Sequence, residues 1–362
     1  MRVPEHRLRR LATALLDQRG APAAAAWLQA DLLIEAELRG LPSHGLMRLP
    51  RLLARIDAGL ADPAAKGRHR WRSAGVLQVD GQRALGPVAL MAALEALTTR
   101  LGTTGIAMAA LRDTNHLGML AYYVEEAAAR GMIGIVLSTS EALVHPQGGT
   151  QALLGTNPVA IGIPTGAAPF VLDLATSQVP MGRIHAHALR GEPIPEGWAV
   201  DAAGQPTQDA EAAKSGALAP FGGAKGYGLG LAFELIVALL AGSELAPQVR
   251  GTLDASHPAT KGDLLILIDP GAVSGVIGGA ARLTAYLDLL RASRPACPDT
   301  PVAIPGDGAR RRKAAAQRDG IDIPEPLLDE LRGLCSRGLS PRKTNGGEEE
   351  WSISARSGRR ER

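Results

Sequence analysis

Cysteine and aromatic residues are scarce in this chain. Its 362 residues include two cysteines, Cys297 and Cys335, and only 3% aromatic residues. The cysteines lack the spacing of a metal cluster, and so few thiols in a long chain favour a reducing compartment over a disulfide scaffold. With little aromatic surface to bury, the core must consist of Ala, Leu, Ile and Val. The 46% hydrophobic and 21% charged residues are ordinary for a folded globular protein.

Signals for membranes and nucleic acids are also missing. The start of the chain leads into an arginine-rich helix instead of the apolar segment of a signal peptide. The apolar stretch 229–241 is interrupted by Glu234, so we expect no membrane span. The net charge of +3 comes largely from the mixed-charge tail, whereas a nucleic-acid surface needs basic residues clustered on a folded face. We therefore expect a cytoplasmic protein without a nucleic-acid or membrane partner.

The motifs of several enzyme classes do not occur. There is no P-loop, no Gly-x-Ser-x-Gly nucleophile elbow and no His-Glu-x-x-His pair. The nearest approach to a Rossmann fingerprint lies at 223–230, where the glycines have the wrong spacing and fall inside an apolar helical pattern. His185 and His187 alternate as they would on one face of a strand, but a zinc site needs further ligands. We predict no metal site.

Hydrophobic periodicity divides the chain into helical ends and an α/β middle. Helical spacing predicts helices at 6–18, 22–39, 48–59, 309–318 and 324–335. Short apolar runs predict strands at 76–79, 105–111, 132–138, 159–163, 170–173 and 264–269. Helical stretches alternate with these strands at 88–100, 117–130, 226–240 and 281–292.

This alternation predicts an α/β fold with helices packed on a sheet. We expect an α/β domain at 71–300 and a helical domain in which residues 1–70 pack with residues 301–336. The polar, glycine-rich and charge-mixed segment 337–362 is expected to be a disordered tail.

The first of four polar segments contains Ser43, His44 and Arg48. Just before a helix, Ser43 can act as an N-cap that accepts hydrogen bonds from free backbone N–H groups. The alternative is a catalytic site, because Arg48 lies one helical turn beyond His44 and both side chains can project toward one cleft. A guanidinium suits a substrate carboxylate, and an imidazole suits proton exchange with a hydroxyl or carbonyl. The residues alone leave both readings open.

Three further regions of the sequence are rich in small and polar residues: the start of the helix after His116, the strand ends at 155–158 and 173–177, and the turn around Lys225. His116 precedes a helix whose N-terminus can bind a cofactor phosphate, although it can also be a structural residue bonded to a backbone carbonyl. Segments 155–158 and 173–177 fall at strand ends, where open α/β sheets bind ligands. Lys225 opens an apolar helix in a glycine-lined turn, and a lysine buried there requires an anionic partner.

Together these segments resemble the malate/L-lactate dehydrogenase family of NAD(P)-dependent oxidoreductases, which lacks a Rossmann domain. That family includes malate, sulfolactate and ureidoglycolate dehydrogenases and reductases of cyclic imino acids. The matching stretches occur in the family's order over roughly residues 5–336: SHGLMRLPRLLARIDAGL, NHLGMLAYYVEEAAARGMIGIVLSTS, LGTNPVAIGIP, FVLDLATS, GEPIPEGWAVDAAGQPTQD, LAPFGGAKGYGLGLAFELI and IPGD.

The resemblance implies a mixed-sheet dinucleotide-binding domain beside a helical domain, in a homodimer whose active site lies between the domains. It implies Ser43 and His44 as an acid–base pair, and Arg48 on the carboxylate of a small-molecule substrate. His116 is implied as the proton acceptor or as a cofactor-lining residue, while Thr156 and Arg183 are expected to bind substrate. The residues expected to line NAD or NADP are His116, Leu117, Gly118, Met119, Leu120, Ser140, Leu174, Ala175, Thr176, Lys225, Gly306 and Asp307.

Two departures from the family pattern bear on the substrate. Many members have tyrosine where this chain has Leu52, so one hydroxyl is lost from the pocket, and Gly182 is followed by Arg183 where the family commonly has lysine. His185 stands near the place of an acidic residue in some imino-acid reductases, which favours a hydroxy acid. We predict hydride transfer between NAD(P) and a small 2-hydroxy or 2-keto acid of the malate, lactate, sulfolactate or ureidoglycolate type. The alternatives are a cyclic imino-acid reductase and a non-catalytic nucleotide-binding paralogue.

Overall fold

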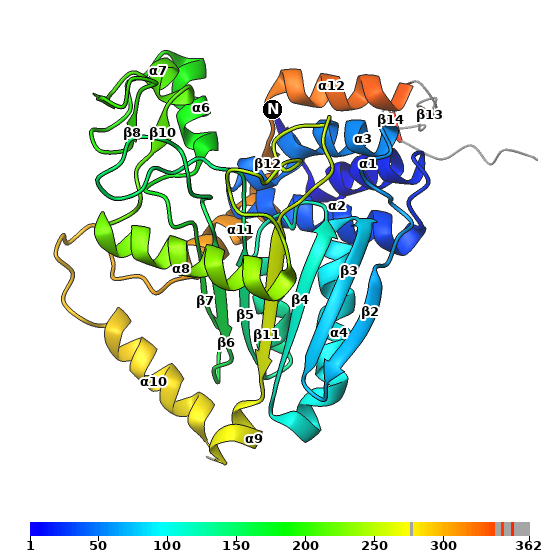
Figure 1. Cartoon of the computed structure of the whole chain (residues 1–362), viewed down its shortest axis with the longest axis vertical. Coiled ribbons are helices and arrows are strands. Elements are labelled where there is room, and N and C mark those ends of the chain that lie inside the picture. Colours follow the sequence, from blue (N-terminus) through cyan, green and yellow to red (C-terminus); the bar gives the residue numbers. More distant parts are fainter. Residues whose placement is uncertain (276–277, 337–341, 344–348, 351–362) are drawn as a thin grey trace, which may run out of the picture.

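A seven-stranded mixed sheet forms the centre of the molecule (Figure 1). The structure, a computed structural model, describes residues 1–336 apart from 276–277, and in addition 342–343 and 349–350. Across the sheet the strands are β2 (Arg68–Ser73), β3 (Val76–Ala84), β4 (Ile106–Thr114), β11 (Gly262–Ile268), β5 (Ile133–Ser138), β6 (Val159–Ile163) and β7 (Phe170–Leu174). Only the β3–β4 pair is parallel, so the predicted α/β fold with a mixed sheet is confirmed.

All the strands predicted from apolar runs lie in this sheet, and β2 is the strand that the sequence pattern missed. Strand β2 is an edge strand with the sequence RHRWRS, in which every residue except the half-buried Trp71 is exposed. An edge strand rich in arginine carries no apolar alternation, because neither of its faces is deeply covered. The hydrophobic pattern of the sequence therefore did not predict a strand at 68–73.

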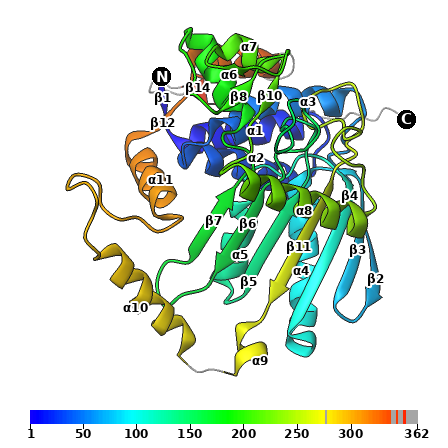
Figure 2. The same cartoon turned by 60° about the vertical axis from the view of Figure 1, so that its left-hand side comes forward.

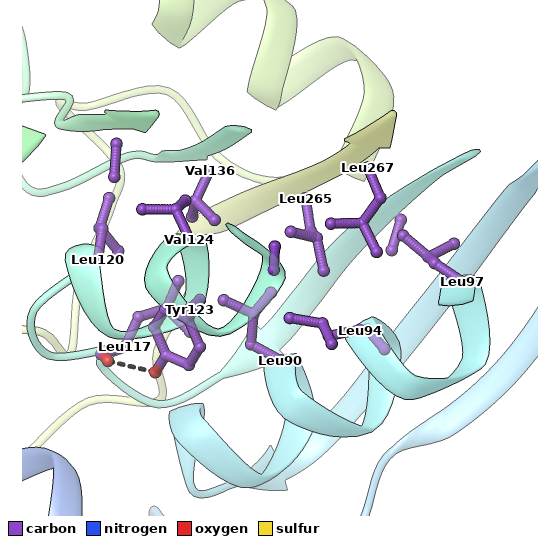
Figure 3. Packing of buried hydrophobic residues seen from close by; sticks show 14 of the residues in the cluster. Leu90, Leu94, Leu97, Leu117, Leu120, Tyr123, Val124, Val136, Leu265 and Leu267 are labelled. Atoms are coloured by element: carbon purple, nitrogen blue, oxygen red, sulfur yellow. Dashed lines mark hydrogen bonds between the residues drawn. The ribbon is translucent and has the colours of Figure 1, made fainter. Parts of the chain in front are cut away.

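Helices cover both faces of the sheet (Figure 2). On one face lie α4 (Gly86–Thr104) and α5 (Ala121–Ala129), and on the other lies α8 (Ala224–Ala241). Side chains alternate along β11: Leu265 and Leu267 join the core beneath α4 and α5, whereas Leu264 packs with Val237 of α8. Figure 3 shows the first core from close by, with leucines of α4 facing Leu265 and Leu267. Each fully buried leucine contributes about 1.5–3 kcal/mol to the stability of this layer.

The two ends of the chain pack together at one end of the sheet (Figure 1). The elements are β1 (Arg2–Val3), α1 (Glu5–Asp17), α2 (Ala23–Leu38), α3 (Leu49–Asp57), α11 (Asp307–Asp319), β12 (Ile321–Asp322) and α12 (Glu325–Ser336). Strand β1 pairs with β12, and Leu8, Leu15 and Leu331 share one buried core. Residues more than three hundred positions apart thus build the same helical layer.

A smaller unit stands beside the sheet. It consists of α6 (Met181–Arg190), β8 (Ala199–Val200), β9 (Pro206–Thr207), α7 (Ala210–Lys214) and β10 (Ala217–Leu218), with strand order β10-β8-β9. His185 and His187 lie on helix α6, so the expectation of a histidine pair on one face of a strand was wrong. The segment is helical because Ile184 and Ala188, four residues apart, bury one helical face. Residues two apart on a helix do not share a face.

The remaining described elements connect these parts or lie outside them. They are the 3₁₀ turns η1 (Pro42–His44) and η2 (Leu46–Arg48), the helices α9 (Pro270–Ser274) and α10 (Gly279–Arg291), and the paired strands β13 (Arg342–Lys343) and β14 (Glu349–Glu350). Apart from those two dipeptides, the tail 337–362 that we predicted to be disordered lies outside the described residues.

Helix α8 is long and apolar enough, by length and composition alone, to cross a membrane. This corrects the expectation that no such run exists, because the helix begins at Ala224 and a single acidic residue does not end it. That residue, Glu234, is 3% exposed and hydrogen-bonded on the sheet side of the helix. The opposite side carries exposed leucines such as Leu239. Helix α8 therefore has a core-packing face and an uncovered apolar face.

Candidate active site

The turn that carries Ser43 and His44 is built from two short 3₁₀ segments. Gly45 separates them with φ −97° and ψ −145°, so Arg48 lies on the second 3₁₀ segment and not one α-helical turn after His44 as expected. Ser43 makes no capping hydrogen bond; its Oγ lies 3.0 Å from Nδ1 of His44. The Arg48 Nε–H donates to the Ser43 carbonyl at 2.8 Å. Ser43, His44 and Arg48 are thus fixed relative to one another.

Glycine at position 45 is required by the approach of Glu37 from α2. A Cβ on Gly45 would lie 2.2 Å from Glu37 Oε1, the atom that accepts the Leu46 N–H at 2.7 Å. Burial of this carboxyl raises the pKa of Glu37 to about 7. Helix α2 therefore holds the Ser43–His44 turn through a buried acid that no sequence motif had indicated.

His116 lies between β4 and α5, with its ring centroid 5.8 Å from that of His44. Its Nδ1 accepts the backbone N–H of Gly118 at 2.8 Å, so the contact is to an amide hydrogen and not to a carbonyl. Gly118 has φ +73°, and a Cβ there would lie 2.1 Å from Leu32 Cδ2, which leaves glycine as the fitting residue. The histidines predicted as alternatives for proton transfer are therefore neighbours.

Burial and positive charge keep both histidines neutral. Burial, aided by the charge of Arg48, lowers the pKa of His44 to about 3. Burial also lowers the pKa of His116 well below its ordinary value, with Arg48, His44 and Lys261 adding to the effect. Burial lowers the pKa of Arg48 itself to about 10, which still leaves it charged at neutral pH. An anion entering this site meets a fixed cation beside two unprotonated imidazoles.

A pocket opens beside these residues between the helical layer and the sheet. Three arginines contribute to it: Arg48 from the 3₁₀ turn η2, and Arg51 and Arg55 from α3. The complete lining is Gln29, Leu32, Leu33, Arg48, Arg51, Leu52, Arg55, Asn115, His116, Gly118, Gly251 and Thr252. Among the predicted site residues, Arg48, His116 and Gly118 belong to it. The sequence could have indicated Arg51 and Arg55 as further site residues. Positions three and four apart share one face of a helix, and a helix was predicted over 48–59.

Arg55 connects the walls of this pocket through hydrogen bonds. Its Nε–H donates to Asn115 Oδ1 at 2.9 Å, and its Nη1 donates to the carbonyls of Asp254 and His257, each at 2.9 Å. The Arg48 Nη1 reaches the Thr252 carbonyl at 3.4 Å. Both arginines therefore hold the same loop, which the sequence patterns did not connect with the site.

A second cluster brings together residues predicted to bind substrate and cofactor. The Thr156 N–H donates to Ser140 Oγ at 2.9 Å, and Thr176 donates its N–H and its hydroxyl to the Thr156 carbonyl at 2.8 and 3.0 Å. The Phe221 N–H donates to the Thr176 carbonyl at 3.0 Å, which places the start of α8 beside the cluster. Ser140, Thr156, Thr176 and the Lys225 helix terminus thus meet.

Glu234 supports this second cluster from α8. Its Oε2 accepts the N–H of Gly155 at 3.2 Å and the side-chain amide of Asn157 at 2.8 Å, while its Oε1 accepts the Ala246 N–H at 2.8 Å. Asn157 adopts φ +31°, an unusual conformation outside glycine, and these bonds hold it there. In the sequence, Glu234 is visible only as an interruption of an apolar run.

Lys225 is exposed, so the expectation of a buried lysine at this helix start was wrong. Gly223 places no side chain over the terminus of α8, and the side chain of Lys225 is exposed to solvent. The buried lysine is Lys261, which forms an ion pair with Asp263. Asp263 also accepts from Ser138 at 2.6 Å and Thr114 at 2.8 Å, so its charge is fully engaged behind the His116 loop.

Other predicted site residues lie outside the pocket or offer only their backbone. The Arg183 guanidinium stacks over Trp198 at 5.1 Å, although the preceding Gly182 packs on Ser43. Asp307 is engaged by Arg291 and Arg310. Gly306 approaches the carbonyl of Val171 on β7. The side chains of three others are buried in the core: Leu117, Met119 and Leu120.

Comparison with known proteins assigns the chain to a family. A family profile described as malate/L-lactate dehydrogenase matches residues 3–332. The chain belongs to the malate/L-lactate dehydrogenase family. It is 35% identical over 322 residues to the L-sulfolactate dehydrogenase of Methanocaldococcus jannaschii, covering 89% of this chain and 93% of that one. It is also 35% identical over 332 residues to a Delta(1)-pyrroline-2-carboxylate reductase of Pseudomonas fluorescens, covering 88% and 94%.

A solved structure agrees with the family assignment. The crystal structure of a dehydrogenase from Sinorhizobium meliloti matches with a TM-score of 0.89 and 64% identity, covering 92% of this chain and 98% of that chain. The resemblance stated from the sequence is confirmed. This malate/L-lactate dehydrogenase family member is a nicotinamide-dependent oxidoreductase acting on hydroxy acids.

The residues around the start of α8 fit the anionic part of a nicotinamide dinucleotide. In this family member, Gly222 and Gly223 turn with φ +56° and +61°, and a Cβ on Gly222 would meet no atom within 4 Å. The helix terminus carries no side-chain cap, and the Lys225 side chain is exposed in its first turn. Backbone amides and a cation at a helix N-terminus suit a diphosphate.

Proposed function

We propose that Arg48 binds the carboxylate of a small 2-hydroxy acid and that His44 accepts its hydroxyl proton. The observation that carries this proposal is that Arg48 and His116 line one pocket, while the ring of His44 lies 5.8 Å from that of His116 and its neighbour Ser43 is hydrogen-bonded to Arg48. A nicotinamide, when bound, would accept the hydride that leaves C2 of the substrate. In the reverse direction the protonated His44 returns its proton to the oxygen of a 2-keto acid.

Hydrogen bonding distinguishes the roles of the two histidines. Because His116 Nδ1 accepts the Gly118 N–H, the proton of neutral His116 resides on Nε2. His116 therefore donates a hydrogen bond to the substrate oxygen and has no free lone pair for a proton. His44 has a different option: its Nδ1–H donates to Ser43 Oγ, which leaves Nε2 free to act as the base. Ser43 is the residue that orients this base.

The charge of Arg48 makes proton acceptance depend on the substrate. In the free protein, burial and Arg48 disfavour a positive charge on His44. A substrate carboxylate beside Arg48 offsets that charge, so His44 becomes a stronger base once the substrate is bound. This coupling favours carboxylate substrates over neutral alcohols.

We further infer that NAD or NADP is held by the cluster of Ser140 and Thr176, the backbone of 117–120 and 174–175, and Lys225. Thr156 lies in the same cluster and is assigned to the substrate side. We also infer that Gly306, whose backbone approaches Val171 of β7, and the adjacent Asp307 border the cofactor, and that Arg183, which follows the Gly182 packed on Ser43, lies near the substrate.

A cyclic imino-acid reductase is the second candidate function. It is favoured by the similarity to the Pseudomonas fluorescens reductase, and it needs the same carboxylate clamp and hydride delivery. The presence of Ser43, His44, Arg48 and His116 together disfavours a non-catalytic nucleotide-binding paralogue.

We propose a cytoplasmic homodimer that covers the exposed face of α8. Five apolar residues on that helix are 43–83% exposed: Leu229, Leu235, Ile236, Leu239 and Leu240. A contiguous apolar face of this kind is unusual on a soluble monomer and typical of a protein interface. A second copy of the chain is the occupant that the family resemblance implies.

The decisive experiment measures oxidation of NADH and NADPH with a panel of 2-keto acids and cyclic imines. We expect turnover of 2-keto acids, with loss in His44→Asn and retention in the exposed control His6→Gln. Turnover of cyclic imines alone would overturn the hydroxy-acid proposal.

A further inference from the structure

The middle strand of the large sheet begins with a buried ion pair to which the proposed chemistry assigns no role. Lys261 directly precedes β11, and Asp263 is the second residue of that strand. The two residues are 1% and 0% exposed. Replacing a buried ion pair by apolar side chains of similar volume is often neutral or stabilising, so stability alone explains such a pair poorly. The hydrogen bonds of Asp263 indicate a different role.

Asp263 connects the two strands on either side of β11 at their C-terminal ends. Its Oδ2 accepts a hydrogen bond from the hydroxyl of Thr114, the last residue of β4, at 2.8 Å. Its Oδ1 accepts a hydrogen bond from the hydroxyl of Ser138, the last residue of β5, at 2.6 Å. Both strands run antiparallel to β11, so their C-terminal ends lie at the same edge of the sheet (Figure 2). One carboxylate therefore fixes two strand ends relative to each other.

The two segments proposed to form the site begin just after these strand ends. His116 and Ser140 each follow an anchored hydroxyl residue by two positions. The intervening residues, Asn115 and Thr139, are both buried. The N–H of Thr139 donates to the carbonyl of Gly262 at 3.0 Å, which ties this segment to the start of β11 a second time. Two residues of chain span at most about 7 Å, so a shift of either strand end also moves the site residue that follows it.

Lys261 keeps the carboxylate of Asp263 in its charged form. Its Nζ forms the ion pair with Asp263 and donates to Thr114 Oγ1 at 3.3 Å. Without this cation, burial would favour the protonated acid, in which one oxygen becomes a donor and accepts a hydroxyl less well. Burial chiefly lowers the pKa of His116, and the charge of Lys261 adds to this effect. The ion pair thus acts on the His116 loop through both hydrogen bonding and charge.

We propose that Asp263 is a positioning residue that sets the distance between the His116 loop and the Ser140 segment. It is completely buried and acts through the hydroxyl groups at the ends of β4 and β5. The β4 branch aligns the hydrogen-bond donor for the substrate oxygen, and the β5 branch aligns the segment for the cofactor. Lys261 keeps the carboxylate able to accept from both branches. This inference rests on the proposed function of the two segments.

Variants that remove single hydroxyl groups separate the two branches. Thr114→Val should lower kcat for 2-keto acid reduction about tenfold, the lower end for a hydrogen bond to a charged group, and leave the KM for NADH or NADPH nearly unchanged. Ser138→Ala should raise that KM about tenfold with little effect on kcat. Thr114→Ser restores the hydroxyl and should recover most of the lost kcat. Thr98→Val on α4 is the matched control, because its hydroxyl bonds within its own helix.

Hydrogen–deuterium exchange tests the positioning without any turnover. In Thr114→Val the amides of 115–120 should exchange faster, because the hydrogen bond from Gly118 N–H to His116 depends on the loop, while the amides of 139–144 should be unchanged. Ser138→Ala should show the reverse pattern. Removal of both buried charges by Lys261→Met with Asp263→Asn leaves no unpaired ion in the core, and it should speed exchange in both segments.

The pattern of results separates positioning from a purely structural role. Parallel changes of kcat and KM in Thr114→Val and Ser138→Ala, or wild-type constants in both, would overturn the proposal. If neither 2-keto acids nor cyclic imines are turned over, the proposed function fails, and the exchange measurement still decides the inference. Faster exchange confined to the segment after each altered hydroxyl supports it, whereas uniform or absent changes overturn it.

Discussion

The Nδ1 atom of His116 accepts the backbone N–H of Gly118 at 2.8 Å, and this bond distinguishes the hydrogen-bonding state of His116 from that of His44. The acceptor role occupies the only lone pair of neutral His116 and leaves a hydrogen on Nε2. The Nδ1 of His44 instead lies 3.0 Å from the Ser43 hydroxyl, which can accept a hydrogen bond from an Nδ1–H and so leave the lone pair on Nε2. The two buried histidines thus differ in their hydrogen bonds, and therefore in whether a ring nitrogen remains free to accept a proton.

Replacement of the two histidines should give different kinetic losses. We expect His44→Asn to lower kcat about 10²- to 10⁴-fold in both directions, because general base catalysis is lost. His116→Gln keeps an N–H near the position of Nε2 and should lose far less activity than His116→Ala. Steady-state kinetics with circular dichroism to verify folding measure this. Equal losses in His44→Asn and His116→Gln would reverse the assignment.

Acid should destabilise the protein through these histidines. The pKa of His44 is about 3 in the fold, against an ordinary value of 6.5, so the unfolded chain binds protons first as the pH falls. The contribution of neutral His44 to the free energy of unfolding is complete above pH 6.5. It is lost as the pH falls toward 3, and the free energy of unfolding then decreases by up to about 1.4 kcal/mol per pH unit for each such histidine. Urea unfolding between pH 4 and 7 should show a shallower pH dependence for His44→Asn than for the wild type. An unchanged slope would contradict the burial of a neutral imidazole.

Glu37 should act in the opposite direction. Its pKa is about 7 in the fold against an ordinary 4.5, so its contribution is complete below pH 4.5 and is lost as the pH rises through 7. Glu37→Gln keeps an acceptor for the Leu46 N–H and removes this titration. We expect the variant to gain stability relative to the wild type at pH 8 but not at pH 5. A constant difference between the two proteins at both pH values would count against the buried acid.

Glycine at position 45 should be indispensable. In Gly45→Ala the new methyl group would lie 2.2 Å from Glu37 Oε1, so the Ser43–His44 turn or α2 must move. We expect a loss of about 1–3 kcal/mol in the free energy of unfolding, together with impaired turnover. Gly102→Ala on α4 is the control, because nothing lies within 4 Å of its added Cβ and alanine favours a helix. Comparable stabilities of the two variants would disprove the close approach.

The uncovered face of α8 should control assembly. Leu239 is 83% exposed, and Leu239→Glu should place a charge in the proposed contact between copies and dissociate the homodimer. Leu189→Glu on α6 is the matched control, because Leu189 is 85% exposed on a different surface. Sedimentation velocity at micromolar concentration distinguishes the species. A monomeric wild type, or a Leu239→Glu variant that remains dimeric, would refute this interface.

The local hydrophobic pattern of the sequence was enough to predict most of the helices and the strands of the large sheet. The strand over 159–163 is a short apolar run, and helix α1 has apolar residues at helical spacing, so that burial in the structure follows both patterns. The exceptions have local causes. The arginine-rich edge strand β2 lacks alternation, and the α6 segment around His185 shows its helical face only through Ile184 and Ala188.

The sequence by itself determined the family, the mixed α/β fold and the candidates Ser43, His44, Arg48 and His116, because these depend on local order and characteristic spacing. The tertiary structure decided which partners those residues meet. Arg55 joins Asn115 and a loop about two hundred positions away, and Glu234 holds the Thr156 segment from another layer. Such contacts arise when distant segments pack on one sheet, and no local pattern encodes them. The directions of the pKa shifts of His44 and His116 have the same origin, because burial by the assembled layers, and not the sequence around each histidine, keeps them neutral.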